Sequence, residues 1–251
     1  MKNAELIKNW EDEESFAFKG WDFSHIDSRW DCPNPPWHYQ SVVKTYLKDT
    51  DILLDMGIGG GEILLTIGHP YNNTFATEAY LPNFELCKKT LSPLGITVAQ
   101  TFTDDKLPFE DGKFDFVINR HESFDLAEIS RVLKKGGFFI TQQVGNQNSL
   151  DLIERFVENF NPHSPGHMVK CYTNTLEQLG FEIIGTDEFI YTVKFFDVGA
   201  FVFYAKVCVW EFPGFTVQKH ADKLCDCQRE AEANGFVSGI GHRFLIVSKK
   251  I

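Results

Sequence analysis

A glycine-rich turn after an apolar segment is the feature of the sequence best suited to chemistry. Residues 51–56 (DILLDM) predict a buried strand, and the turn GIGGG, residues 57–61, follows at once. Glycine lets the backbone turn tightly and approach a ligand without a clash at Cβ. A dinucleotide-binding loop has its third glycine at the sixth position, where this chain has Glu62. The carboxylate of Asp55 would repel a pyrophosphate, and it suits a ligand that carries an ammonium and a sulfonium.

A second polar run, Asn119-Arg120-His121-Glu122, follows the predicted strand 114–119. The ordinary pKa of histidine lies close to neutrality, so His121 could take a proton from an oxygen or nitrogen atom of a substrate. Glu122 could orient His121 or bind a cation. The alternative interpretation is that His121 caps or packs locally.

The elements that must position these residues alternate between strands and helices. The predicted strands are residues 51–56, 73–78, 96–101, 114–119, 138–144, 181–186 and 242–248. The predicted helices are residues 37–48, 62–67, 82–91, 123–133, 149–159, 173–179, 198–210 and 216–233. This alternation predicts an α/β fold whose seven-stranded, mostly parallel sheet has helices on both faces. Ligands bind such sheets beyond the carboxyl ends of the strands.

These motifs, in this order, resemble the class I S-adenosylmethionine-dependent methyltransferases. The first motif of that family is an acidic residue followed by Gly-x-Gly-x-Gly, and residues 55–61 match it fully. Residues 107–118 resemble the family's stretch before and through the fourth strand, and residues 128–137 resemble its segment into the fifth strand. The resemblance covers residues 37–190 and extends to the final strand, and it implies a Rossmann-like sheet.

The resemblance implies S-adenosyl-L-methionine as the cofactor and gives roles to individual residues. The backbone of the glycine turn would face the methionine moiety, and the N-terminus of the next helix would offer partial positive charge to its carboxylate. Glu78 would accept both ribose hydroxyl groups, although a solvated strand end is the alternative for this residue. The implied cofactor-binding residues are Asp55, Gly57, Ile58, Gly59, Gly61, Glu78, Ala79, Asp104, Asp105, Leu107, Asn119 and Arg120.

One position departs from the family pattern. The family often has an aspartate four residues before Leu107, where it contacts the adenine amine, and this chain has Thr103 there. We expect Asp104 or Asp105 to serve the adenine from a loop shifted by one residue, with a solvated acidic loop as the alternative. The run after the fourth strand also differs from the Asn/Asp-Pro-Pro-Tyr motif of methyltransferases that act on base amino groups, which disfavours that substrate class.

Aromatic residues are concentrated in a leader, residues 1–36, that precedes the predicted methyltransferase domain, residues 37–251. The leader is either a lid over the cofactor and acceptor or an extra layer packed on the sheet. An insertion of about residues 190–240 either shapes the acceptor pocket or forms a packed helix pair. The residues expected near the transferred methyl group are His121 and Glu122. The residues expected to bind the acceptor are Trp30, Trp37, Tyr39, Gln143 and Trp210.

Composition narrows the classes of partner. The formal net charge is −11, and adjacent basic residues occur only in pairs, which disfavours a nucleic acid held by its phosphates. The chain starts MKNAELIKNWEDEES, without the apolar core of a signal peptide, and no membrane span is expected. We therefore expect a cytoplasmic protein with six free cysteines. No metal site is expected, because Cys225 and Cys227 lie two residues apart on a predicted helix and would not share a face.

The sequence is compatible with three functions. The first is methyl transfer to an oxygen or nitrogen atom of a small molecule, for which the acidic and aromatic character favours a neutral, apolar or cationic acceptor. The second is methylation of a base in ribosomal or transfer RNA. Residues 128–152 and the aromatic segment ending in Trp210 resemble the ribosomal-RNA guanine-N1 methyltransferases, but those enzymes carry an N-terminal four-ligand zinc site, and this chain has only Cys32 there. The third is binding of S-adenosylmethionine without catalysis.

Overall fold

The computed structural model describes residues 2–18, 22–158, 160 and 168–251, and the chain forms two compact units. The first, which we call the sheet unit, comprises Pro35–Gly145, Pro165–Glu188 and Arg243–Ile251. The second, which we call the leader unit, comprises Met1–Asn34, Asn146–Ser164 and Phe189–His242. Each unit is therefore assembled from three segments that are distant in sequence.

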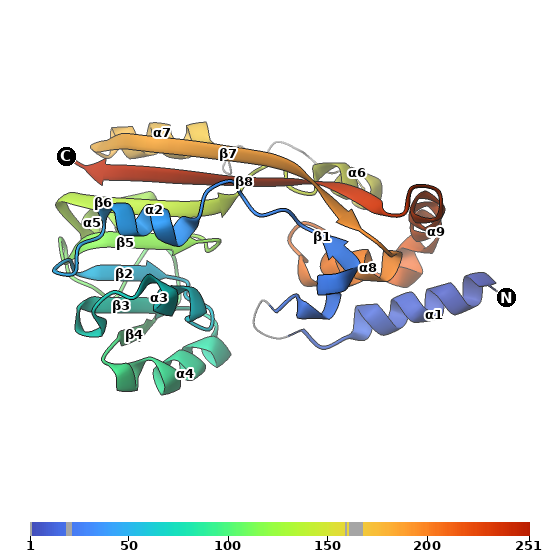
Figure 1. The fold of residues 1–251 in the computed structure, drawn as a ribbon, viewed down its shortest axis with the longest axis horizontal. Coiled ribbons are helices and arrows are strands. Elements are labelled where there is room, and N and C mark those ends of the chain that lie inside the picture. The colour runs from blue at the N-terminus through green and yellow to red at the C-terminus, as the bar shows by residue number, and fades with distance from the viewer. Residues whose placement is uncertain (1, 19–21, 159, 161–167) are drawn as a thin grey trace. The chain divides into compact units, whose positions relative to one another are not determined.

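An eight-stranded sheet has the strand order β1-β7-β8-β6-β5-β2-β3-β4 (Figure 1). Its strands are β1 (Trp30–Asp31), β2 (Leu53–Met56), β3 (Thr74–Glu78), β4 (Thr97–Gln100), β5 (Phe114–Arg120), β6 (Leu133–Val144), β7 (Phe181–Phe195) and β8 (Val237–Lys250). The run β6-β5-β2-β3-β4 is parallel, whereas β8 is antiparallel to β6 and β1 is antiparallel to β7. The predicted α/β, Rossmann-like fold with a mostly parallel sheet is confirmed.

The sheet has one strand more than the seven predicted, and the extra strand comes from the leader. Trp30 pairs with Phe195, and Asp31 pairs with Lys194. This pairing arises because β7 continues to Phe195, well beyond its predicted end at residue 186, and offers the leader a free edge.

Helices cover both faces of the parallel strands. One face carries α2 (Tyr39–Tyr46), α3 (Glu62–Ile67) and α4 (Leu81–Thr90), and the other carries α5 (Leu126–Val132) and α7 (Val169–Gln178). In β2, Leu53 packs in the apolar cluster on the face that carries α2, α3 and α4. Its neighbour Leu54 packs in the cluster on the face that carries α5 and α7. Because successive strand residues point to opposite faces, a central parallel strand must be apolar on both sides, as β2 is.

The ends of three parallel strands meet at one edge of the sheet. Met56, the last residue of β2, lies opposite Thr77 of β3 and Asn119 of β5. The turns that follow these strands therefore leave the same edge, which is where parallel sheets bind their ligands.

The strand β6 begins earlier than the sequence predicts. α5 ends at Val132, and Leu133 already pairs with Phe114. The register of β5 against β6 then shifts between Phe114 and Phe116, and Gly136 has a φ of 83°. The Lys-Lys-Gly-Gly segment that was predicted to end a helix is thus an irregular part of a strand, because glycine permits the left-handed residue that such a bulge uses.

The leader and the insertion share one hydrophobic core in the leader unit. The helices of this unit are α1 (Lys2–Ser15), α6 (Leu150–Phe156), α8 (Val198–Val207) and α9 (Val217–Asn234). Trp10 of α1, Ile26 and Phe201 of α8 are all buried in the same cluster. Arg29 also binds Glu13 and Asp197, each over 2.6 Å. Residues 2–15 therefore form a packed helix that the sequence analysis missed, and a lid function for residues 1–36 stays a prediction.

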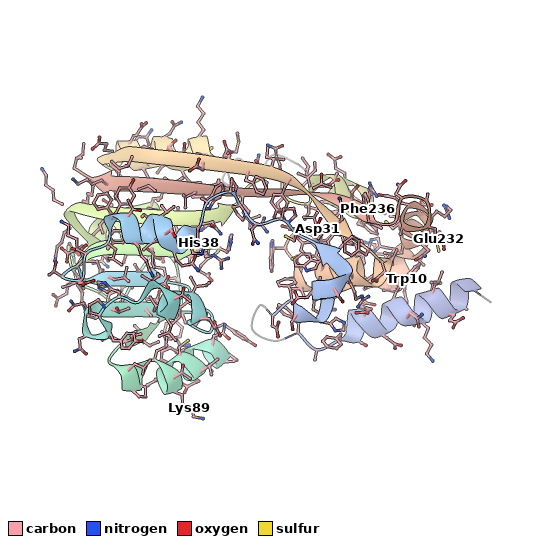
Figure 2. All side chains as sticks on the ribbon, in the orientation of Figure 1. Trp10, Asp31, His38, Lys89, Glu232 and Phe236 are labelled. Carbon is pink, nitrogen blue, oxygen red and sulfur yellow. The ribbon has the colours of Figure 1, made fainter. Side chains whose placement is uncertain are left out.

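Replacing Trp10 with alanine is expected to lower the free energy of unfolding of the leader unit by about 3 kcal/mol, because a large side chain leaves the shared core. Trp10 (Figure 2) is 3% exposed, whereas Trp210 is 60% exposed, so Trp210→Ala is the matched control. We expect that control to stay within about 0.5 kcal/mol of the unchanged protein. Urea denaturation followed by circular dichroism measures the free energy of unfolding of both variants. Equal losses of free energy in Trp10→Ala and Trp210→Ala would argue against a shared core.

Candidate active site

The glycine turn leads from β2 into α3 through three left-handed residues. Gly57, Gly59 and Gly61 have φ values of 69°, 58° and 87°, in a region that residues with side chains rarely adopt. The backbone N–H groups of Gly57 and Ile58 donate to the carbonyl oxygen of Thr77 over 3.0 and 3.2 Å. These two bonds fix the turn to β3, so the predicted ligand-binding loop has a defined shape.

Gly59 forms hydrogen bonds through both its N–H and its carbonyl group, and the space at its Cβ position is open. Its N–H donates to Glu78 Oε2 over 2.8 Å, and its carbonyl oxygen accepts from Cys87 Sγ over 3.1 Å. No atom of the described residues lies within 4 Å of the position that a Cβ would take at Gly59. A ligand can therefore reach this backbone without displacing a side chain.

The other two glycines of the turn are covered by the protein itself. A Cβ at Gly57 would strike the side chain of Glu122, and a Cβ at Gly61 would lie 2.7 Å from Leu91 Cδ1. Glycine is needed at these positions for packing as well as for φ. Glu122, predicted to lie near the transferred methyl group, is thus placed directly against the turn.

Glu78 fixes the turn with both of its carboxylate oxygens. Oε2 accepts from the N–H of Gly59, and Oε1 accepts from the N–H of Tyr80 over 2.9 Å. Each oxygen of an ionised carboxylate has a second acceptor site. Glu78 can therefore hold the loop and still accept hydroxyl groups of a ligand, as the family resemblance implies.

Asp55 is a buried carboxyl group directly before the turn. Burial raises the pKa of Asp55 to about 8, although the nearby Arg120 acts in the opposite direction. Within the described part of the chain, no hydrogen bond or ion pair reaches this carboxyl group. Asp55 is therefore mostly protonated at neutral pH, and a cation placed beside it would favour the ionised form.

A buried amide network surrounds Asn119 at the end of β5. Its Oδ1 accepts from Gln143 Nε2 and from Thr141 Oγ1, and the phenol of Tyr39 donates to its backbone carbonyl over 3.1 Å. Asn119 Nδ2 is buried and has no hydrogen-bond partner among the described residues. Since an unpaired buried donor costs free energy, this amide N–H is available to donate a hydrogen bond to a ligand atom. Gln143 and Tyr39, expected to bind the acceptor, both support Asn119 here.

His121 is connected to Trp37 through Gln142. The backbone N–H of His121 donates to the carbonyl oxygen of Gln142 over 2.9 Å, and Gln142 Nε2 lies 3.0 Å from His121 Nε2. Trp37 Nε1 donates to Gln142 Oε1 over 2.8 Å. Although part of His121 is open to solvent, the surrounding protein desolvates its ring and lowers its pKa well below the ordinary value, and Arg120 and Arg243 act in the same direction.

An acidic residue, Glu122, and a basic residue, Arg120, lie on either side of His121 in the sequence. Burial raises the pKa of Glu122, and the carboxylates of Glu78 and Asp104 reinforce the shift. On the other side, Arg120 is exposed, and within the described residues its side chain forms no hydrogen bond or ion pair. Burial lowers the pKa of Arg120, as does Arg243, but a guanidinium stays charged at neutral pH.

The segment predicted to serve the adenine is anchored at one end. Leu107 is buried, and its N–H donates to Glu128 Oε1 over 2.6 Å. Arg131 binds Glu128 and donates to the carbonyl oxygen of Leu107 over 3.2 Å. Asp104 and Asp105 are exposed, so their role toward a ligand stays a prediction.

The sheet unit brings together most of the predicted site residues. Those at its carboxyl edge are Asp55, Gly57, Ile58, Gly59, Gly61, Glu78, Ala79, Asn119, Arg120, His121 and Glu122. Trp30 and Trp210 belong to the leader unit, where Trp30 stacks on Phe23 with ring centroids 5.7 Å apart. Gln142 also lies in the sheet unit, although it is not among the residues predicted from the sequence. Its signal was the run of three polar residues, 141–143, directly after the apolar residues 138–140 of β6.

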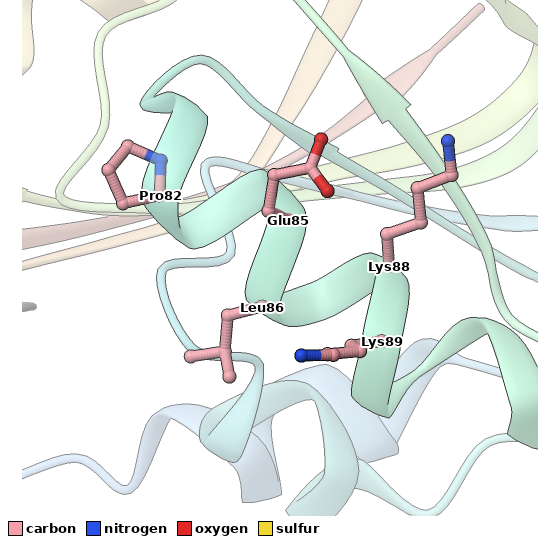
Figure 3. Close-up of a pocket in the computed structure, with 5 residues that line it drawn as sticks. All are labelled: Pro82, Glu85, Leu86, Lys88 and Lys89. Atoms are coloured by element: carbon pink, nitrogen blue, oxygen red, sulfur yellow. The ribbon is translucent and has the colours of Figure 1, made fainter.

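A hollow of about 400 Å³ on α4 lies apart from these residues. Figure 3 shows its lining, which comes from that helix alone: Pro82, Glu85, Leu86, Lys88 and Lys89. None of these residues is among the predicted ligands, and we assign no function to this hollow.

Among the described residues, no three His, Cys, Asp or Glu side chains are grouped to hold a metal ion. No helix of that part of the chain has both the length and the apolar character to cross a bilayer.

Comparison with known proteins gives one family match and a set of similar folds. Residues 54–141 match the family described as methyltransferase domain. A proposed methyltransferase from Bacillus halodurans C-125 is 18% identical, with a TM-score of 0.57 over 84% of this chain and 96% of its own. A geranyl diphosphate methyltransferase, solved in complex with SAM, is 15% identical, with a TM-score of 0.50 over 84% of each chain.

One structural relative extends over the whole chain. A functionally unknown protein from Deinococcus radiodurans R1 is 12% identical, with a TM-score of 0.55, and covers 100% of this chain and 99% of its own. No curated protein matches the sequence. At such identities the structures establish the fold alone, and the family match is confined to residues 54–141. Residues 54–141 are therefore similar to a methyltransferase domain, and they lie within a Rossmann-like fold.

Proposed function

We propose that this chain binds S-adenosyl-L-methionine at the glycine turn and transfers its methyl group to an oxygen or nitrogen atom of a small-molecule acceptor. The observation that carries the proposal is Gly59. Its N–H and carbonyl are both fixed by the protein, and the space where a side chain would stand is open. A rigid, uncovered backbone of this kind suits close contact with a ligand.

The residues around Gly59 fit this cofactor chemically. Asp55 would face the ammonium group, Glu78 would accept the ribose hydroxyls, and the unpaired Asn119 Nδ2 would donate to a ligand oxygen. When bound, the cofactor supplies an electrophilic methyl group on a sulfonium, and S-adenosylhomocysteine remains after transfer. The residues of the chain orient the acceptor lone pair toward that methyl group and exclude water, which can supply much of the barrier reduction.

A small acceptor is part of this proposal. The charge of −11 and the basic residues adjacent only in pairs offer little to a phosphate backbone. A cytoplasmic location belongs to the same proposal, and the six free cysteines are in keeping with a reducing compartment.

A methyl-transfer screen over cell extract tests the proposal. The full chain is incubated with tritiated S-adenosylmethionine and extract, and the RNA and small-molecule fractions are then separated. We expect label in the small-molecule fraction. Label in RNA alone would overturn the acceptor class, and cofactor binding without any label would favour a protein that binds the cofactor without catalysis.

Replacing Glu78 with glutamine is expected to weaken cofactor binding about 10- to 100-fold, the equivalent of one or two hydrogen bonds to a charged group. The glutamine offers one acceptor oxygen, whereas Gly59 and Tyr80 both donate to Glu78. The matched control is Glu85→Gln on the exposed face of α4, which we expect to be neutral. Titration calorimetry with S-adenosylhomocysteine compares them, and equal affinity in the two variants would remove Glu78 from the site.

A further inference from the structure

The hydrogen bonds around Gln142 determine which way its carboxamide points. An indole N–H can only donate, so the atom 2.8 Å from Trp37 Nε1 must be the Gln142 oxygen. The amide nitrogen of Gln142 therefore faces the other way, toward His121. Gln142 is buried, 4% exposed, so water does not compete freely for these contacts.

This orientation in turn determines the state of the imidazole. Both hydrogens of a carboxamide nitrogen are donors, so His121 Nε2, 3.0 Å away, must accept. It accepts only when it carries no proton, which leaves the proton of the neutral ring on Nδ1. An imidazolium would place one N–H against another. The positive charges of Arg120 on β5 and Arg243 on β8 also favour the neutral ring.

The backbone holds the ring in this place. His121 has a φ of 64°, which is uncommon for a residue with a side chain, and its N–H is bonded to the carbonyl oxygen of Gln142. One residue, Gln142, therefore contacts both the backbone and the ring of His121. Strained positions that are held so firmly are typical of functional sites.

We infer that Trp37 and Gln142 hold His121 as a neutral imidazole whose Nδ1–H donates a hydrogen bond to an oxygen atom of the methyl acceptor. Gln142 and Trp37 are positioning residues, and His121 is a donor rather than the general base that the sequence suggested. Within the described residues, no hydrogen bond engages Nδ1, so this donor is available to a ligand. The inference rests on the proposed function, since it needs an acceptor.

The charge beside His121 narrows the class of acceptor. Arg120 follows directly on the buried Asn119 and is exposed, and its guanidinium forms no hydrogen bond or ion pair within the described residues. Arg120 and His121 Nδ1–H are both donors. Together they suit a carbonyl, phenolate or carboxylate oxygen, and they disfavour an ammonium group. Of the neutral, apolar and cationic acceptors that the total charge favoured, the cationic class is thereby disfavoured, because Arg120 places a positive charge at the end of β5.

The tautomer can be read directly, without turnover. Long-range proton–nitrogen correlation spectra of the full, ¹⁵N-labelled chain distinguish a protonated ring nitrogen from a bare one, and loss of one ring in His121→Asn assigns the signal. We expect a protonated Nδ1 and a bare Nε2. In Gln142→Glu the carboxylate accepts from both neighbours, so the proton should move to Nε2. The control Gln218→Glu, on the exposed face of α9, should leave the spectrum unchanged. A protonated Nε2 in the unchanged protein overturns the inference.

Turnover separates a donor from a base. The amide of asparagine places an N–H close to the position of Nδ1, and asparagine tolerates a left-handed backbone. Using tritiated-methyl incorporation into the small-molecule fraction, we expect a loss of about 10-fold or less in kcat for His121→Asn and about 100-fold for His121→Ala. Equal losses would show a base and contradict the inference. If no variant and no unchanged protein transfers methyl groups, the proposed function fails, while the spectra still report the tautomer.

Discussion

Alanine at position 59 is expected to abolish most cofactor binding while leaving the protein folded. The added methyl group meets no atom of the described protein, so it enters the open space that we assign to the cofactor. Overpacking of a close backbone contact should lower affinity about 100-fold, the equivalent of ~3 kcal/mol. The left-handed φ of 58° adds about 1 kcal/mol of strain, which a folded domain tolerates.

Gly112 provides a matched control for this variant. It has the same φ of 58°, and a Cβ there also meets no atom within 4 Å. It lies between β4 and β5, where its N–H donates to the carbonyl oxygen of Arg131. Gly112→Ala should therefore lose as much unfolding free energy as Gly59→Ala and keep full cofactor affinity. Calorimetry with S-adenosylhomocysteine and urea denaturation compare the pair, and equal affinity in both would locate the cofactor elsewhere.

The second large effect concerns Asp55 and pH. The pKa of Asp55 is about 8, so at a pH below 8 this carboxyl group is mostly protonated in the free protein. A cationic cofactor favours the ionised form, so binding should release a proton, and affinity should rise about tenfold per pH unit from pH 6 toward 8. Asp55→Asn should remove this slope and weaken binding about 30- to 100-fold at pH 8. Calorimetry in two buffers with different heats of ionisation counts the protons, and a flat pH profile for the unchanged protein would contradict the role of Asp55.

The same group should make folding stability depend on pH. The pKa of Asp55 is raised to about 8 in the folded protein from 3.8, so the folded state binds the extra proton between these values. Its stabilising contribution is complete below pH 4 and is lost as the pH rises through 8. Asp55→Asn should therefore be more stable than the unchanged protein at pH 8, by an amount on the order of 5 kcal/mol, and nearly equal to it at pH 4. Urea denaturation at both values checks the sign, and a gap that narrows as the pH rises would refute it.

The turn and its carboxylates could be predicted because their requirements are local. Gly57, Gly59 and Gly61 adopt backbone angles that glycine alone allows easily, and they follow an apolar strand at fixed spacing. Asp55 is the residue before the end of β2, and Glu78 is the last residue of β3, which pairs with β2. Such features depend on a few neighbouring residues, so their pattern appears in the sequence.

The role of Gln142 could not be predicted because it depends on which face of β6 is involved. Successive strand residues point to opposite faces. Gln143 shares a face with Asn119 and Thr141, whereas Gln142 faces Trp37 and His121. Only the pairing of β6 with β5 in the folded sheet determines which of the two glutamines contacts His121.

The helix α1 of the leader could not be predicted for a related reason. α1 carries few apolar residues, and Leu6, Ile7 and Trp10 form a narrow stripe that predicts a helix weakly. Its stability comes from packing against α8, a segment about 190 residues later in the chain. Contacts at such separation leave no local pattern, so the shared core of leader and insertion had to be observed.

The most direct test of the central claim is to map S-adenosylmethionine onto the full, ¹⁵N-labelled chain by nuclear magnetic resonance. We expect saturable shifts in the backbone amide signals of Gly57, Gly59 and Gly61 and of the residues after Glu78, and we expect these shifts to be absent in Gly59→Ala. The absence of any shift in the unchanged protein at saturating cofactor, or shifts confined to residues away from this turn, would contradict the central claim.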